Sequence, residues 1–142
     1  MKYLVLVSHG KFAEGLKNTL SMFAGQREDV IAAGLLDNAT AEQFAVTFEE
    51  IIQPITAEDE IVVLADIVGG SPLTTALNVL GNKGYLANTV VMGGMNLPLA
   101  LTTVLMKDNL PNDVLVPTAL GEATTALQQF VLATSNDDED EI

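Results

Sequence analysis

The sequence contains no cysteine, no tryptophan and only one histidine, His9. Because cysteine is absent, disulfides, thiolate metal sites and thiol catalysis are all excluded. A single histidine is too few for a histidine-rich metal cluster, so we expect no metal site. For covalent chemistry, the sequence leaves a serine hydroxyl or the one imidazole as nucleophile.

Basic side chains are scarce as well, because 6 lysines and arginines oppose 19 aspartates and glutamates for a net charge of −13. Nucleic-acid affinity depends on basic side chains that neutralise phosphates, so this balance argues against a nucleic-acid partner. No apolar run reaches the roughly 18 residues that a membrane helix needs, and we expect no membrane insertion. The apolar run at residues 3–7 is too short for a signal peptide, which favours a cytoplasmic protein.

Short apolar runs alternate along the chain with patterns typical of helices. The runs lie at residues 3–7, 30–36, 61–65 and 86–92. They lack polar alternation, which is typical of parallel strands buried on both faces. Spacings of three and four between apolar residues predict the helices, the first of them through Phe12, Leu16, Leu20 and Phe23. Thr40 and Gln43 form a capping-box pattern before the second helix.

These patterns predict a small doubly wound α/β domain of the flavodoxin-like type, with a mainly parallel sheet of order 2-1-3-4. Residues 114–116 are expected to form a short fifth strand. A last helix is expected over residues 118–134, with Leu120, Ala123, Leu127, Phe130 and Val131 facing inward. We therefore interpret residues 1–134 as one domain and residues 135–142, which hold five acidic side chains, as an acidic disordered tail.

Several residues with chemical potential directly follow predicted strands. Ligands of such folds bind beyond the carboxyl ends of the strands, where the strand order reverses. The residues at these ends are His9 and Gly10 after the first strand, Asp66, Gly69, Gly70 and Ser71 after the third, and Gly93 and Gly94 after the fourth. In a 2-1-3-4 order the first and third strands are neighbours, so we expect His9 and Asp66 to face each other.

A carboxylate beside an imidazole accepts the proton of one ring nitrogen and leaves the other nitrogen free, as a general base or a nucleophile. Gly10, Gly69, Gly70 and the helix start at Ser71 would surround this pair. Ser71 is expected to be the N-cap of that helix, with Pro72 as its first helical residue. Glycines let backbone amides approach closely, and a helix N-terminus favours an anion. Each element has an ordinary structural interpretation by itself, as a packed histidine, a capping aspartate or a glycine turn. Together they indicate a histidine that carries a phosphoryl group.

The motifs Ser8-His9-Gly10, Asp66-Ile67-Val68-Gly69-Gly70-Ser71-Pro72 and Gly93-Gly94-Met95-Asn96-Leu97-Pro98 have a counterpart in a known family. Over about residues 1–132 the chain resembles the mannose-family enzyme IIA of the bacterial phosphoenolpyruvate-dependent sugar phosphotransferase system. The resemblance implies that His9 takes phosphate from the carrier protein HPr and passes it to an enzyme IIB component. It implies that Asp66 holds the imidazole and that Ser71 and the amides near Gly69 and Gly70 bind the phosphate.

The resemblance also implies a homodimer, whose last strand several members exchange between subunits, here at residues 114–116. It implies no cofactor, because the phosphoryl donor is already activated. Many members are fused to a IIB domain, but this chain ends after the IIA region, so we expect a IIB partner on a separate chain. Paralogous carriers that feed a dihydroxyacetone kinase share the first-strand histidine but typically lack a segment like residues 69–72. The presence of this segment here favours a component of sugar transport over such a carrier.

Two other classes of protein stay open at this stage. A flavodoxin-like module that binds a small molecule would use the same edge of the sheet, with His9 only lining the site. An aromatic content of 5% without tryptophan counts against a stacked flavin. A receiver domain phosphorylated on Asp66 would need an acidic cluster after the first strand, where Ser8, His9 and Gly10 stand instead.

Overall fold

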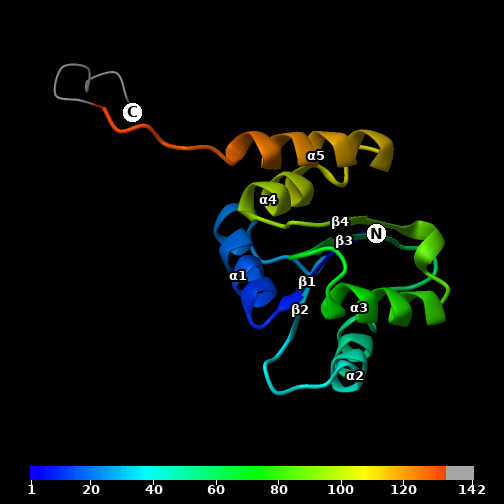
Figure 1. Ribbon diagram of the computed structural model, residues 1–142. Helices are drawn as coiled ribbons and strands as arrows, with labels where there is room; N and C mark the ends of the chain where they lie inside the picture. Colours follow the sequence, from blue (N-terminus) through cyan, green and yellow to red (C-terminus); the bar gives the residue numbers. More distant parts are fainter. Residues whose placement is uncertain (134–142) are drawn as a thin grey trace.

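A parallel four-stranded sheet forms the centre of the computed structural model, which describes residues 1–133 (Figure 1). The strands are β1 (Lys2–His9), β2 (Val30–Leu35), β3 (Glu60–Ala65) and β4 (Thr89–Met92). Their order is β2-β1-β3-β4, and every neighbouring pair is parallel. The predicted doubly wound α/β fold and its strand order are confirmed.

Helices cover both faces of this sheet (Figure 1). They are α1 (Phe12–Ala24), α2 (Ala41–Ile51), α3 (Ser71–Asn82), α4 (Leu97–Met106) and α5 (Asn112–Ala126), with a short 3-10 turn, η1 (Leu86–Asn88), before β4. Helices α2 and α3 lie on one face, α1 and α4 lie on the other, and α5 packs on the outside of α4. No helix among residues 1–133 has the length and apolar character needed to cross a membrane.

The two inner strands, β1 and β3, are buried on both faces. Tyr3, Val5 and Val7 of β1 pack in the cluster that includes α2 and α3, whereas Leu4 and Leu6 pack in the cluster that includes α1 and α4. Side chains on both faces of these strands are buried and apolar, so the strands appear in the sequence as continuous apolar runs. A rigid core of this kind holds the carboxyl ends of β1 and β3 side by side.

The helix signals in the sequence are largely confirmed. Thr40 accepts a hydrogen bond from the Gln43 amide at 3.1 Å, and the Gln43 side chain accepts one from the Thr40 amide at 2.8 Å, so the capping box is present. In α1, Leu16 and Leu20 are buried as the spacing predicts. Phe12 and Phe23, at the two ends of the helix, are instead half exposed.

The predicted fifth strand at residues 114–116 is wrong, because this segment lies within α5. A three-residue apolar run carries too little periodicity to separate a strand from a helix. Leu115, Ala119 and Ala123 recur at spacings of four and are the buried residues of α5. They pack in the same core cluster as α4, which accounts for the lack of a polar face on α4 within one subunit.

The predicted last helix is displaced toward the N-terminus. It ends at Ala126 rather than residue 134, and Leu127, Phe130 and Val131 are 84%, 72% and 67% exposed instead of facing inward. Beyond Ala126 the chain runs away from α4 (Figure 1), so no apolar surface in the described part of the chain stabilises a further helical turn. The acidic tail predicted at residues 135–142 lies outside the described residues.

Candidate functional site

His9 and Asp66 meet at the carboxyl edge of the sheet, as the strand order predicts. Asp66 follows β3, and its amide donates to the Val7 carbonyl at 3.2 Å, which continues the β1–β3 pairing past the strand end. Oδ2 of Asp66 accepts a hydrogen bond from the His9 amide at 2.9 Å and lies 2.8 Å from Nδ1 of the His9 ring. One carboxylate oxygen therefore holds both the backbone and the imidazole of His9.

The environment of Asp66 favours its charged form. Burial by itself raises the pKa of this carboxyl, but hydrogen bonds from the His9 amide, the His9 ring and the Ile67 amide outweigh burial and leave the pKa lowered. The Ile67 amide donates to Oδ1 at 2.9 Å, so both carboxylate oxygens are bonded. Asp66 is therefore an ionised acceptor at neutral pH.

This geometry decides which nitrogen of His9 is free. An ionised carboxylate can only accept hydrogen bonds, so the proton of the neutral ring must lie on Nδ1. Nε2 then carries the lone pair. The His9 side chain is 48% exposed while that of Asp66 is only 17% exposed, so the ring can meet a second protein while the carboxylate stays screened from water. The pair is arranged for nucleophilic attack or proton transfer at Nε2.

Ser8 fixes the chain immediately before His9. Its side chain is fully buried, and its hydroxyl oxygen accepts a hydrogen bond from the Ala13 amide at 2.7 Å. The first turn of α1 is thereby tied to the end of β1. In the sequence Ser8 stands out only as part of the Ser8-His9-Gly10 motif, because a serine five residues before a helical amide does not fit the usual spacing of an N-cap.

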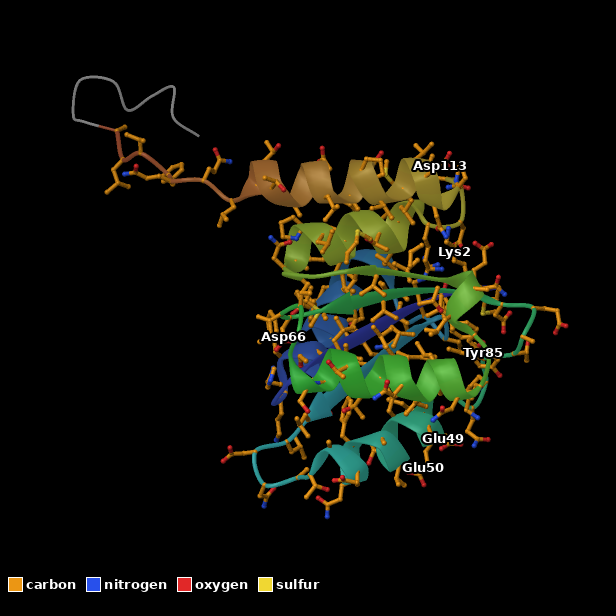
Figure 2. The ribbon with its side chains drawn as sticks, turned by 45° about the vertical axis from the view of Figure 1, so that its right-hand side comes forward. Lys2, Glu49, Glu50, Asp66, Tyr85 and Asp113 are labelled. Carbon is orange, nitrogen blue, oxygen red and sulfur yellow. The ribbon has the colours of Figure 1, made fainter. Side chains whose placement is uncertain are left out.

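The loop from Ile67 to Gly70 passes close to the His9 ring. Gly69 has a φ of 86°, which side chains rarely adopt, and a Cβ at Gly70 would lie only 2.9 Å from Cε1 of the ring. Gly70 therefore leaves the space in which the imidazole packs. Figure 2 shows Asp66, at the start of this loop, at one end of the strands, with Lys2 at the opposite end.

Ser71 lies one position further into α3 than the sequence predicts. Gly70 is the N-cap and Ser71 is the first helical residue, followed by Pro72. The close approach of the ring requires glycine at the capping position, and proline is tolerated in a first turn because its missing amide would have no helical partner. No side chain caps this end of α3. The sequence-predicted residues Gly69, Gly70 and Ser71 thus all follow Asp66 in one turn beside His9, and Gly10 adjoins His9 with a φ of 57°.

The second glycine pair lies behind the loop and does not reach His9. A Cβ at Gly93 would overlap Cγ2 of Val68, so this glycine lets the loop pack against the end of β4. The Met95 amide donates to the Ala65 carbonyl at 2.9 Å, and Asn96 caps α4 through the Leu99 amide at 2.8 Å. These contacts indicate a supporting role for this turn.

Three hollows in the surface of residues 1–133 are lined by neither His9 nor Asp66. The histidine instead lies on an open edge, and the neighbouring loop carries the exposed side chains of Ile67 and Val68, which are 54% and 75% exposed. An open histidine held by a carboxylate suits contact with another macromolecule better than enclosure of a small ligand.

Fold and site together define a doubly wound α/β domain with an exposed histidine–aspartate pair at its topological switch point. Comparison with known families agrees with this description, because the family described as PTS system fructose IIA component matches residues 3–119. The chain belongs to this family of sugar phosphotransferase system IIA components, and the resemblance inferred from its motifs is confirmed.

Individual relatives are distant. The mannose-specific EIIAB component of the PTS from Escherichia coli (strain K12) is 27% identical over 118 residues, which are 82% of this chain and 36% of that protein. This chain therefore spans about a third of the length of that relative. The fructose-specific EIIA component from Bacillus subtilis (strain 168) is 23% identical over 107 residues, 75% of this chain and 71% of that protein.

Solved structures confirm the fold. A PTS IIA protein associated with the fucose utilization operon of Streptococcus pneumoniae aligns with a TM-score of 0.76 and 27% identity, over 90% of this chain and 92% of that chain. The mannose/sorbose specific IIA subunit from Enterococcus faecalis aligns with a TM-score of 0.77 at 24% identity, over 94% and 98% of the two chains.

Proposed function

We propose that His9 is a phosphoryl carrier, which accepts phosphate from phospho-HPr and passes it to an enzyme IIB component during sugar uptake. The observation that carries this proposal is the bond between His9 Nδ1 and Asp66 Oδ2, because it leaves Nε2 free on an exposed ring. Membership of the IIA family supports the two partners. Both transfers are protein-to-protein encounters at one exposed histidine, in the cytoplasm.

In the proposed reaction Nε2 attacks the phosphorus of a phosphohistidine on the donor. The Nε2–P bond forms as the donor N–P bond breaks, and the donor imidazole leaves with the electron pair. The His9 ring becomes cationic while it keeps its Nδ1 proton, and ionised Asp66 stabilises that charge. The amides at Gly70 and Ser71 and the Ser71 hydroxyl are proposed to hold the phosphoryl oxygens, and Gly10 and Gly69 are proposed to let the two turns approach them closely.

The experiment that tests this function supplies phosphoenolpyruvate labelled in its phosphate, together with enzyme I and HPr. We expect label on the protein that is lost in acid and that moves on to an added IIB component. One histidine is present, so nitrogen–phosphorus coupling in the NMR spectrum assigns the modified atom, which we expect to be Nε2. Acid-stable label, or an acyl phosphate that requires magnesium, would instead indicate phosphorylation elsewhere, with Asp66 as the first candidate.

We expect replacement of Asp66 by asparagine to slow phosphoryl transfer by about 10²- to 10⁴-fold, the usual contribution of a group that assists proton and charge placement. The amide cannot stabilise a cationic ring as a carboxylate does, although it preserves the shape of the side chain. Rapid-quench measurement of transfer from phospho-HPr checks this rate. The variant should keep the circular dichroism spectrum of the wild type, and an unchanged rate would remove Asp66 from the mechanism.

We further propose that the protein forms a homodimer through residues 127–133. Leu127, Phe130, Val131 and Leu132 are between 67% and 84% exposed, which is unusual for four large apolar side chains so close together. The chain here is extended and lies outside any helix (Figure 1). The outer edge of β4 has no strand neighbour among the described residues, so an extended segment of a second copy can pair with it.

Light scattering should therefore report a mass twice the 15.0 kDa of one chain. The double variant Phe130→Asp and Leu132→Asp should be monomeric, because burial of two unpaired charges opposes association. Met22→Asp is the matched control, since Met22 of α1 is 80% exposed but lies on another surface, and this variant should stay dimeric. A dimer that survives the double variant would place the interface elsewhere.

A further inference from the structure

The turn that carries His9 rests against the end of β2. In the parallel register Ser8 lies opposite Gly34 and His9 opposite Leu35. The Gly10 amide donates a hydrogen bond to the Leu35 carbonyl at 2.7 Å. This hydrogen bond continues the pairing with β2 for one residue beyond the end of β1, next to the His9 imidazole.

At Gly34 there is no space for a side chain. A Cβ built on this residue would overlap the carbonyl oxygen of Gly10 and lie 3.1 Å from its carbonyl carbon. Both of these atoms belong to the backbone, so no side-chain rotation can relieve the overlap. Gly10 has a φ of 57°, which glycine adopts without strain, and in this conformation its carbonyl occupies the space beside Gly34.

The turn has little freedom to absorb a displacement. Before Gly10, the His9 amide is bonded to Asp66 at 2.9 Å, and after it the Ala13 amide is bonded to the buried Ser8 hydroxyl at 2.7 Å. The Gly10 amide is bonded to Leu35. A carbonyl pushed away from Gly34 must therefore stretch or break at least one of these bonds, and two of them set the position of His9.

We propose that Gly34 is a positioning residue for phosphoryl transfer, an inference that rests on the proposed role of His9. The absence of a side chain at position 34 lets the Gly10 carbonyl pack against β2, and this contact sets the distance between the His9 ring and Asp66. The atoms nearest to a Cβ at Gly34 are backbone atoms of Gly10 and Lys11, so Gly34 acts on the imidazole through the turn. Glycine is therefore required at this position by the turn that carries His9 rather than by the strand.

The test is the variant Gly34→Ala with Gly121→Ala as matched control. A Cβ at Gly121, within α5, meets nothing within 4 Å. For Gly34→Ala we expect kcat for transfer from phospho-HPr to fall about 100-fold, the effect of a misplacement of roughly 1 Å, with little change in KM because the surface around the ring is kept. The control should transfer phosphate at the wild-type rate.

A second measurement needs no phosphate and so separates this inference from the proposed function. His9 is the only histidine, so its ring nitrogen resonances are observed without overlap. In the wild type and in Gly121→Ala we expect a slowly exchanging Nδ1 proton bonded to Asp66, and in Gly34→Ala we expect that signal to be lost or shifted. If the wild type takes up no phosphate while this spectral difference is present, the proposed function fails and the positioning role stands.

The double variant Gly34→Ala and Gly121→Ala guards against simple unfolding, because alanine in place of glycine stabilises a helix interior. Circular dichroism should show both Gly34 variants folded. Wild-type kcat together with an unchanged ring spectrum would overturn the proposal. Failure of both variants to fold would overturn it as well, because glycine would then be required by the strand rather than by the position of His9.

Discussion

A variant with alanine at position 9 is expected to take up no label from phosphoenolpyruvate, enzyme I and HPr. The residue supplies the nucleophile itself, and the sequence offers neither a second histidine nor a cysteine to replace it. Asp66 lies 2.8 Å from the ring but is ionised and bonded at both oxygens, so it is a poor substitute acceptor. Label should therefore fall to the background of a reaction without HPr, measured after separation of the proteins at alkaline pH.

Loss of label in this variant reports chemistry only if the fold is intact. The His9 side chain is 48% exposed, and its removal deletes one partly solvated hydrogen bond, which contributes about 0.5–1.5 kcal/mol. The backbone amide at position 9 still donates to Asp66. We therefore expect a native circular dichroism spectrum and a small change in the free energy of unfolding. Persistent acid-labile label on the alanine variant would refute the carrier role of His9.

The largest loss of stability is expected from Asp29→Asn. Lys107 is buried, with 1% of its surface exposed, and its Nζ lies 2.6 Å from Oδ2 of Asp29. Arg27 also donates two hydrogen bonds to the same carboxylate, at 2.8 and 2.9 Å, and these bonds hold its pKa well below the usual range. Removing one partner of a buried pair costs about 3–5 kcal/mol, because the other charge is left poorly compensated.

We expect the lower end of that range, near 3 kcal/mol, because Lys107 keeps Asp108 at 3.1 Å and the Lys2 carbonyl at 2.6 Å. Urea unfolding followed by circular dichroism measures the difference. Asp108→Asn is the matched control, since Asp108 is 51% exposed and water screens its bonds to Lys107 and Arg27, each of which contributes at most about 1 kcal/mol. Equal effects of the two substitutions would contradict a special role for the buried pair.

The difference in free energy of unfolding between the wild type and Asp29→Asn should depend on pH, because the pKa of Asp29 is lowered in the folded protein. A carboxyl whose pKa is depressed in the folded state stabilises the fold above its unfolded pKa, near 3.9, and loses this contribution as the pH falls toward the folded value. The wild type should therefore lose stability below about pH 4, while Asp29→Asn, which lacks the titrating group, loses less. The difference in free energy of unfolding between the two proteins should therefore become smaller as the solution becomes more acidic.

The central part of the fold follows from local patterns in the sequence. Continuous apolar runs around Val5 and Val63 predict strands buried on both faces, and both are fully buried in β1 and β3. Thr40 and Gln43 mark the start of α2 correctly. These signals are reliable because a buried strand and a capped helix constrain the residues within them directly.

Local patterns failed where the outcome depends on a distant surface. The pattern of residues 114–116 is compatible with a strand or with a helix. Burial of Leu115 in the core cluster that includes α4 favours the helix. Leu127 and Phe130 have helical spacing, but nothing within residues 1–133 buries that face, and both side chains are exposed. The buried pair of Lys107 and Asp29 gives no local signal at all, because its members are 78 residues apart in the chain.

The sequence by itself determined which residues this protein can use for covalent chemistry. It offers one imidazole and no thiol, and it places His9 and Asp66 at the ends of strands that a 2-1-3-4 sheet makes neighbours. Only the tertiary structure decided the position of the imidazole. Parallel pairing brings Asp66 and Gly70 to the His9 ring and Gly34 against the backbone of Gly10, and distances between separate strands are set by packing rather than by any local pattern.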